Sequence, residues 1–142
     1  MIEVRGARDS AEREALLALR HEVFVDEQGV PRELEIDEHD ERAVHIVAFE
    51  DGELVGTCRL LQAGAQAKFG RLVVVRPARG RGIGAALLAE AERQARALGC
   101  DQMVLAAQTS AMGLYERAGY TAHGEVYLDA GIEHVTMEKV LA

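Results

Sequence analysis

Apolar residues recur at helical spacing in two long stretches of the chain. The first predicted helix starts at Asp9 as N-cap, with Glu12 completing a capping box, and ends at residues 29–31. Its apolar face consists of Leu16, Leu19, Val23 and Phe24. A second helix is predicted over residues 83–98, with Gly99 as its C-cap. Its apolar face consists of Ile83, Leu87, Ala91 and Ala95.

Runs of apolar and β-branched residues, bounded by turn signals such as Asp51-Gly52, predict seven strands. They cover residues 2–7, 43–49, 53–61, 68–76, 102–107, 120–128 and 134–140. The continuous apolar runs at residues 72–75 and 102–107 are typical of strands buried on both faces. A short helix is expected at residues 110–118. Residues 32–42 are dominated by acids, which predicts a solvated loop with one helical turn.

The order of these elements predicts a mixed α/β fold. Antiparallel hairpins flank a single strand–loop–helix–strand crossover, so the sheet is expected to be mixed, with helices packed on it. A chain of 142 residues is long enough for one domain with a sizeable core, and we assign residues 1–142 to it.

Charge and targeting signals narrow the function. The formal net charge of −8 argues against a nucleic-acid partner, which normally meets a basic face. The N-terminus lacks the apolar core of a signal peptide, and no apolar run reaches membrane-spanning length, so a cytoplasmic protein without a membrane partner is expected. Cys58 and Cys100 match no metal-ligand spacing, so we expect no metal and two reduced, buried thiols.

The strongest local motif is the loop Arg79-Gly80-Arg81-Gly82-Ile83-Gly84, which lies between an apolar strand and the second long helix. Unpaired N–H groups at a helix start attract phosphate, glycines allow close approach, and arginines add charge-assisted hydrogen bonds. A Walker loop needs Gly-Lys followed by Ser or Thr, which is absent. A dinucleotide site also needs an acid about twenty residues on, and residues 102–107 contain none. A plain basic turn before a core helix is the alternative.

Two motifs resemble those of the GNAT family of N-acetyltransferases. The loop matches the family signature at Arg79, Gly82 and Gly84. Residues 108–120 match a second signature at Ala111, Tyr115 and Gly119, while Gln108, Leu114 and Tyr120 depart from it. The resemblance covers the whole chain. Residues 20–28 and 124–134 are most similar to the small bacterial ElaA/YjcF-like group within this family.

The resemblance implies a GNAT fold, in which a mostly antiparallel sheet of six to seven strands splays between central strands 4 and 5. It implies direct transfer of an acetyl group from acetyl-CoA to an amine, through a ternary complex. The donor-binding residues that it implies are Leu72, Val73, Val74, Val75, Arg79, Gly80, Arg81, Gly82, Ile83, Gly84, Ala85, Gln108 and Tyr115.

Tyr115 is the catalytic residue that the resemblance implies, as the acid that protonates the departing thiolate. A purely structural tyrosine is the alternative. An alkyl ammonium ionises near pH ~10, so a base or a water path must remove its proton. His45 and His134 are the candidate bases, and Phe24, Glu27 and Arg59 are candidates for binding the acceptor.

Two other functions remain open at this point. The acidic residues 35–40, together with residues around Arg20 and Arg59, resemble part of the acyl-homoserine-lactone synthases, but a chain of 142 residues is short for that class. The second alternative function is a sensor that binds acyl-CoA without turnover. The presence of Tyr115 argues against it. The acceptor amine, small molecule or protein, is not identified, and a homodimer built on the C-terminal strands would suit the family.

Overall fold

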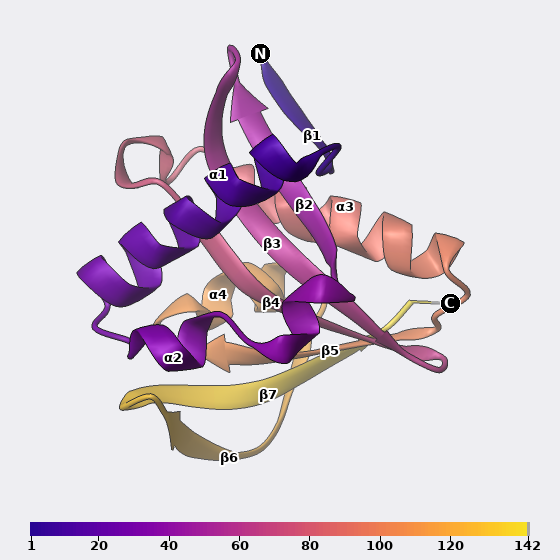
Figure 1. Cartoon of the computed structure of the whole chain (residues 1–142). Helices are drawn as coiled ribbons and strands as arrows, with labels where there is room; N and C mark the ends of the chain where they lie inside the picture. Colours follow the sequence, from indigo (N-terminus) through magenta and orange to yellow (C-terminus); the bar gives the residue numbers. More distant parts are fainter. Residues whose placement is uncertain (142) are drawn as a thin grey trace.

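The computed structural model describes residues 1–141, which build one seven-stranded sheet flanked by helices (Figure 1). The strands are β1 (Ile2–Gly6), β2 (Val44–Glu50), β3 (Glu53–Ala63), β4 (Gln66–Val74), β5 (Gln102–Gln108), β6 (Thr121–Asp129) and β7 (Ile132–Val140). Their order is β1-β2-β3-β4-β5-β7-β6, and only β4 and β5 pair in parallel. The mixed, mostly antiparallel sheet predicted from the sequence is confirmed.

Helices lie on both faces of this sheet, with α1 in front of it and α3 behind it in Figure 1. The helical elements are α1 (Ser10–Arg20), η1 (His21–Glu27), α2 (Arg32–Glu35), η2 (Glu38–Glu41), η3 (Arg76–Ala78), α3 (Ile83–Ala97), η4 (Thr109–Ala111) and α4 (Met112–Arg117). No helix within residues 1–141 is both long and apolar enough to cross a membrane.

The first helix differs from its prediction in two ways. It changes to a π-helix over His21–Glu27, where the sequence indicated a continuous α-helix. Asp9 does cap it, because its carboxylate accepts the N–H of Glu12. The predicted capping box is wrong, however: the Glu12 carboxylate accepts from the Arg8 N–H and from the Arg5 guanidinium instead. A guanidinium within reach competes successfully for that carboxylate.

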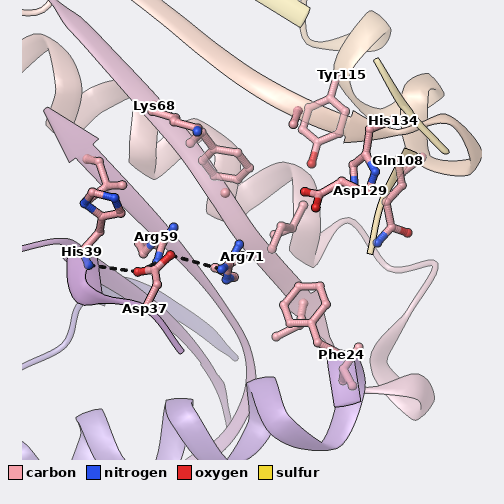
Figure 2. Close-up of a pocket in the computed structure, with 18 of the residues that line it drawn as sticks. Phe24, Asp37, His39, Arg59, Lys68, Arg71, Gln108, Tyr115, Asp129 and His134 are labelled. Carbon is pink, nitrogen blue, oxygen red and sulfur yellow. Dashed lines mark hydrogen bonds and ion pairs between the residues drawn. The ribbon is translucent and has the colours of Figure 1, made fainter. Parts of the chain in front are cut away.

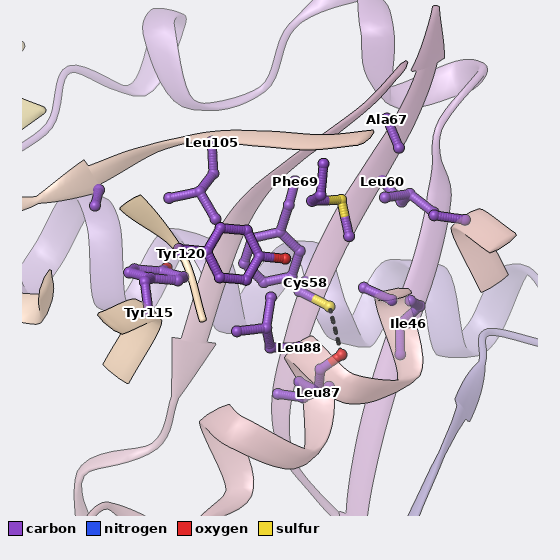
Figure 3. Packing of buried hydrophobic residues seen from close by; sticks show 14 of the residues in the cluster. Ile46, Cys58, Leu60, Ala67, Phe69, Leu87, Leu88, Leu105, Tyr115 and Tyr120 are labelled. Carbon is purple, nitrogen blue, oxygen red and sulfur yellow. Dashed lines mark hydrogen bonds between the residues drawn. The ribbon is translucent and has the colours of Figure 1, made fainter. Parts of the chain in front are cut away.

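The main core lies between the sheet and α3 (Figure 3). The predicted apolar face of this helix, Ile83, Leu87, Ala91 and Ala95, is fully buried as expected. Cys58 of β3 points to the same side and donates its thiol to the carbonyl of Leu87. The close contact with α3 explains Gly56 on β3, since a Cβ there would lie 3.0 Å from the Leu87 side chain.

β4 and β5 stay paired only at one end. Hydrogen bonding joins Gln66–Phe69 to Gln102–Leu105, and the strands then part. Beyond that point β4 follows β3, with a bulge near Arg71, while β5 follows β7. The prediction that residues 72–75 are buried on both faces is therefore wrong. Only Val73 is buried in that run, because the parting strands leave a gap instead of a covered face.

Most of the acidic segment at residues 32–42 is exposed and it contains short helical turns, as its composition predicted, but two of its acids are buried. Glu35 and Asp40 are only 3% and 7% exposed, and both bind the buried guanidinium of Arg20 from α1. Arg59 of β3 also binds Asp40, and it bonds Asp37 at 2.8 Å. These contacts hold the pKa of Asp40 below its usual range despite the opposing effect of burial. Ion pairing with residues distant in sequence explains how the acids become buried.

We predict that Arg20→Ala lowers the free energy of unfolding by about 3–5 kcal/mol, because it leaves the buried carboxylate of Glu35 without a cation and removes one of the two guanidinium groups that bind Asp40. Urea denaturation followed by circular dichroism measures this change. Arg93→Ala is the control, since it breaks only an exposed ion pair on α3 and should change stability far less. Equal effects of the two substitutions would contradict the importance of the buried pair.

Candidate functional site

A cavity of about 1000 Å³ opens where β4 and β5 separate (Figure 2). One wall comes from β3, β4 and the segment between α1 and β2, and the other comes from β5, α4, β6 and β7. The residues predicted from the sequence that line it are Phe24, Arg59, Leu72, Val73, Val74, Arg79, Gln108, Tyr115 and His134. Residues far apart in the chain thus meet in one place, as expected for a binding site.

The start of α3 lies beside this cavity and has no side-chain cap. Its N-cap residue is Gly82, at φ +83°, and Ala86 is the residue whose N–H bonds back to the Gly82 carbonyl. The N–H groups of Ile83, Gly84 and Ala85 therefore have no acceptor within the helix. A Cβ added at Gly80 or Gly82 would meet nothing within 4 Å, so the space above the turn is open. Such a turn fits a phosphate group.

Both arginines of this loop are paired with carboxylates. Arg79 binds Glu27 through two hydrogen bonds of 2.8 and 2.9 Å, and its Nε donates to the Val74 carbonyl at 2.8 Å. Arg81 binds Glu50 in the same two-pronged way. Hydrogen bonding to Arg79 lowers the pKa of Glu27 to about 2. Glu27 does not line the cavity, so the structure places it at the loop, away from the expected acceptor site.

Tyr115 on α4 is held rigidly, with its hydroxyl pointing into the cavity (Figure 2). The residue is 6% exposed, and its ring packs edge-on against Phe69 and Tyr120 at centroid distances of 6.2 and 6.0 Å. Burial raises the pKa of the phenol, so it stays protonated and can donate. Within residues 1–141 the hydroxyl makes no hydrogen bond, which leaves it free to act on a ligand.

His134, at the start of β7, faces the same cavity. Its Nδ1 lies 2.7 Å from the carbonyl oxygen of Ile132, which can only accept, so Nδ1 carries the proton. In this tautomer Nε2 is the hydrogen-bond acceptor of the ring. Tyr127 stacks on the ring and fixes its plane. Gln108 also lines the cavity, and its amide donates to Gln28 at 2.9 Å.

Two other candidate groups are not brought to the site. His45 is 7% exposed, does not line the cavity, and donates from Nε2 to the Asp40 carbonyl. Burial lowers the pKa of His45, so the ring is a neutral structural group. Cys58 is fully buried, and burial raises the pKa of its thiol, which keeps it from acting as a nucleophile.

Several charged residues of the cavity were missed in the sequence. They are Asp37, His39, Arg42, Lys68, Arg71 and Asp129. The signal was present in part, because Lys68 and Arg71 interrupt a strand that is otherwise largely apolar. Among the described residues, no group of three or more His, Cys, Asp or Glu side chains is placed to hold a metal ion.

The cavity thus brings together Tyr115, Arg79 and the parting ends of β4 and β5, which the resemblance to N-acetyltransferases also implied. The chain belongs to the acetyltransferase (GNAT) domain family, whose model matches residues 7–141. This confirms the family resemblance of the two motifs and the expected enzyme class.

Individual relatives agree with this assignment. YjcF of Bacillus subtilis (strain 168), named an uncharacterized N-acetyltransferase, is 38% identical over 122 residues, which cover 85% of this chain and 87% of that protein. An acyl-CoA N-acyltransferase from Pseudomonas aeruginosa is 35% identical with a TM-score of 0.85, and 99% of each chain is covered. ElaA of Escherichia coli is 28% identical with a TM-score of 0.87, covering 98% of this chain and 99% of the other. The expected ElaA/YjcF-like group is confirmed.

Proposed function

We propose that this acyltransferase moves an acetyl group from acetyl-CoA directly to an amine, within a ternary complex. The observation that carries the proposal is that the uncapped start of α3 and the free hydroxyl of Tyr115 adjoin the same gap between β4 and β5. A thioester that spans the gap from the helix start would bring its sulfur toward that hydroxyl. The P. aeruginosa relative, named for acyl-CoA, adds support.

The donor has a complementary surface along β4. Its pyrophosphate would accept hydrogen bonds from the N–H groups of Ile83, Gly84 and Ala85 at the start of α3, with Arg79 and Arg81 as charged partners. The pantetheine arm would lie along the unpaired edge of β4, where the departure of β5 leaves backbone groups without a strand partner. Val75 donates its N–H to Val55 on β3, so the N–H of the preceding Val74 is directed toward the gap. That N–H is suited to polarise the thioester carbonyl.

The chemistry then needs three proton transfers: two away from the acceptor nitrogen and one to the departing thiolate. His134 Nε2 accepts a proton from the acceptor ammonium, directly or through one water, and the freed amine attacks the thioester carbon. A C–N bond forms, and the nitrogen of the adduct loses its second proton to solvent. The C–S bond then breaks, Tyr115 gives its proton to the departing thiolate, and water restores the proton of Tyr115. The products are an acetylated amine and CoA. Buried Cys58 has no part in this, so transfer proceeds without an acyl-enzyme.

Release of free thiol from acetyl-CoA, measured across a panel of amines, tests this function. We expect at least one amine to raise the rate well above hydrolysis, and Tyr115→Phe to lower kcat by roughly 10²-fold or more while the Kd for acetyl-CoA changes little. The phenylalanine keeps the ring packing and removes only the hydroxyl. An unchanged kcat would remove Tyr115 from its role as acid. Binding of acetyl-CoA with no amine-dependent release would support a sensor instead.

We also predict that Glu27→Gln tightens CoA binding, by roughly a few-fold, because the carboxylate competes with phosphate for Arg79 and repels it. With a pKa lowered to about 2, Glu27 is ionised at neutral pH, so the competition is always present. Isothermal titration calorimetry with CoA measures the effect. Glu90→Gln is the control, because its partner Arg93 lies outside the loop. Weaker binding by Glu27→Gln would mean that Glu27 positions Arg79 for the phosphate.

A further inference from the structure

Cationic side chains outnumber acidic ones on the cavity wall formed by β3, β4 and the segment before β2. Arg42, Arg59, Lys68 and Arg71 line this wall, against the single carboxylate of Asp37. The whole protein carries a formal net charge of −8, so this local excess runs against the overall balance. A concave site with one sign of charge concentrates ligands of the opposite sign. The excess of positive charge on this wall therefore favours ligands that carry a negative charge.

The buried acids nearby do not cancel this charge. Glu35 and Asp40 are engaged by Arg20, and Asp40 also binds Arg59, which bonds Asp37 as well. These contacts balance Arg20 and Arg59. Arg71 has only one carboxylate contact, a 3.3 Å hydrogen bond to the already shared Asp37.

Lys68 and Arg42 have no carboxylate partner at all within residues 1–141, where every ion pair joins other groups. Arg42 reaches only the imidazole of His39, at 3.3 Å. Lys68 stands on β4 opposite Leu61, is exposed, and lines the cavity from the same wall as Arg59 (Figure 2). Both cations are available to a ligand.

Arg71 is held in a strained position that directs it to the cavity. Its φ of +54° is rare for a residue with a side chain, and it lies at the β4 bulge. Its guanidinium donates to the carbonyls of Glu35 and Leu34, which fixes it at the wall. Burial lowers the pKa of Arg71, and the nearby Arg59 and Arg20 lower it further. A bound anion would counter both effects.

The opposite wall of the cavity carries a negative charge. Asp129 lines it, next to His134 and Tyr115 (Figure 2). A carboxylate there suits an incoming ammonium, close to the groups that would handle its proton. The cavity is therefore polarised, with a cation-binding side near the proposed chemistry and an anion-binding side at Lys68 and Arg71.

We propose that the acceptor is an amine that also carries an anionic group, a carboxylate or a phosphate. The anionic group binds Lys68 and Arg71, with Arg42 at the edge, while the amine lies between His134 and Tyr115. This substrate class rests on the proposed acetyl transfer and specifies its acceptor side.

Matched amine pairs that differ by one negative charge test this class. Suitable pairs are L-serine and L-serinamide, phosphoethanolamine and ethanolamine, and glucosamine 6-phosphate and glucosamine. The readout is the ratio of kcat/KM for the anionic member to that for its neutral counterpart, at saturating acetyl-CoA. Intrinsic amine reactivity belongs to the substrate, so it cancels when this ratio is compared between protein variants.

We expect the wild type to favour the anionic member of at least one pair, and Lys68→Gln to reduce that ratio by roughly threefold to tenfold, mainly through KM. Lys68→Arg should restore much of the ratio. Arg93→Gln removes an exposed positive charge from α3, away from the cavity, and should leave the ratio unchanged. The side chain of Lys68 is exposed and makes no hydrogen bond within residues 1–141, so we expect its replacement to leave the fold intact.

A ratio that Lys68→Gln does not change, or a wild type that acetylates no anionic member while it still binds acetyl-CoA, would overturn the proposed acceptor class. The anion that the cations bind could instead belong to the donor. Acetyl-dephospho-CoA separates these sources: if Lys68→Gln weakens binding of acetyl-CoA but not of the dephospho form, the cations serve the donor and the inference is wrong. Failure of the wild type to bind acetyl-CoA would count against the proposed function itself.

Discussion

β4 and β5 hold together through only four residues of each strand, and their separation beyond Phe69 and Leu105 makes the rest of the site possible. Each strand keeps its partner on the far side, so the sheet divides without losing its ladders. What remains is an edge of unpaired backbone that demands hydrogen bonds. A ligand with amide groups can provide them, and Gly84 at the start of α3 lies close to Leu72 on that edge.

The buried ions around Arg20 give the other half of the cavity its shape. They attach the irregular segment before β2 to α1 and to Arg59 on the sheet. Because this segment carries Asp37 and provides the carbonyls that hold Arg71, the same contacts that stabilise the fold also set the charges of the acceptor side. The ion pairs that stabilise this part of the fold therefore also form part of the cavity wall.

Local sequence patterns correctly predicted the features that depend on interactions between neighbouring residues. The helical face of α3, the hairpin at Asp51-Gly52 and the open glycine turn depend on neighbours in the chain, so they were readable. Burial of Glu35 depends on Arg20, fifteen residues away, and composition alone indicated a solvated loop. The exclusion of His45 from the cavity likewise follows from packing. A single sequence does not show which distant residues will pair or pack together in the fold.

Tyr115 and His134 also show which features the sequence reveals and which require the folded structure. Family motifs indicated the tyrosine, but its free hydroxyl at the cavity became visible only with the fold. For the base, the sequence left two histidines open, and the structure places His134 at the cavity and His45 away from it. The position of Arg71 at the cavity could be found only from the backbone structure, because no sequence pattern indicates its positive φ.

Backbone amide chemical shifts, recorded by NMR during titration with CoA, test most directly whether the β4–β5 gap and the start of α3 hold the donor. The account predicts large shifts at residues 80–85 and 72–75, and small ones in β6 at the far edge of the sheet. Saturable binding that leaves the amides of residues 80–85 unchanged would contradict it.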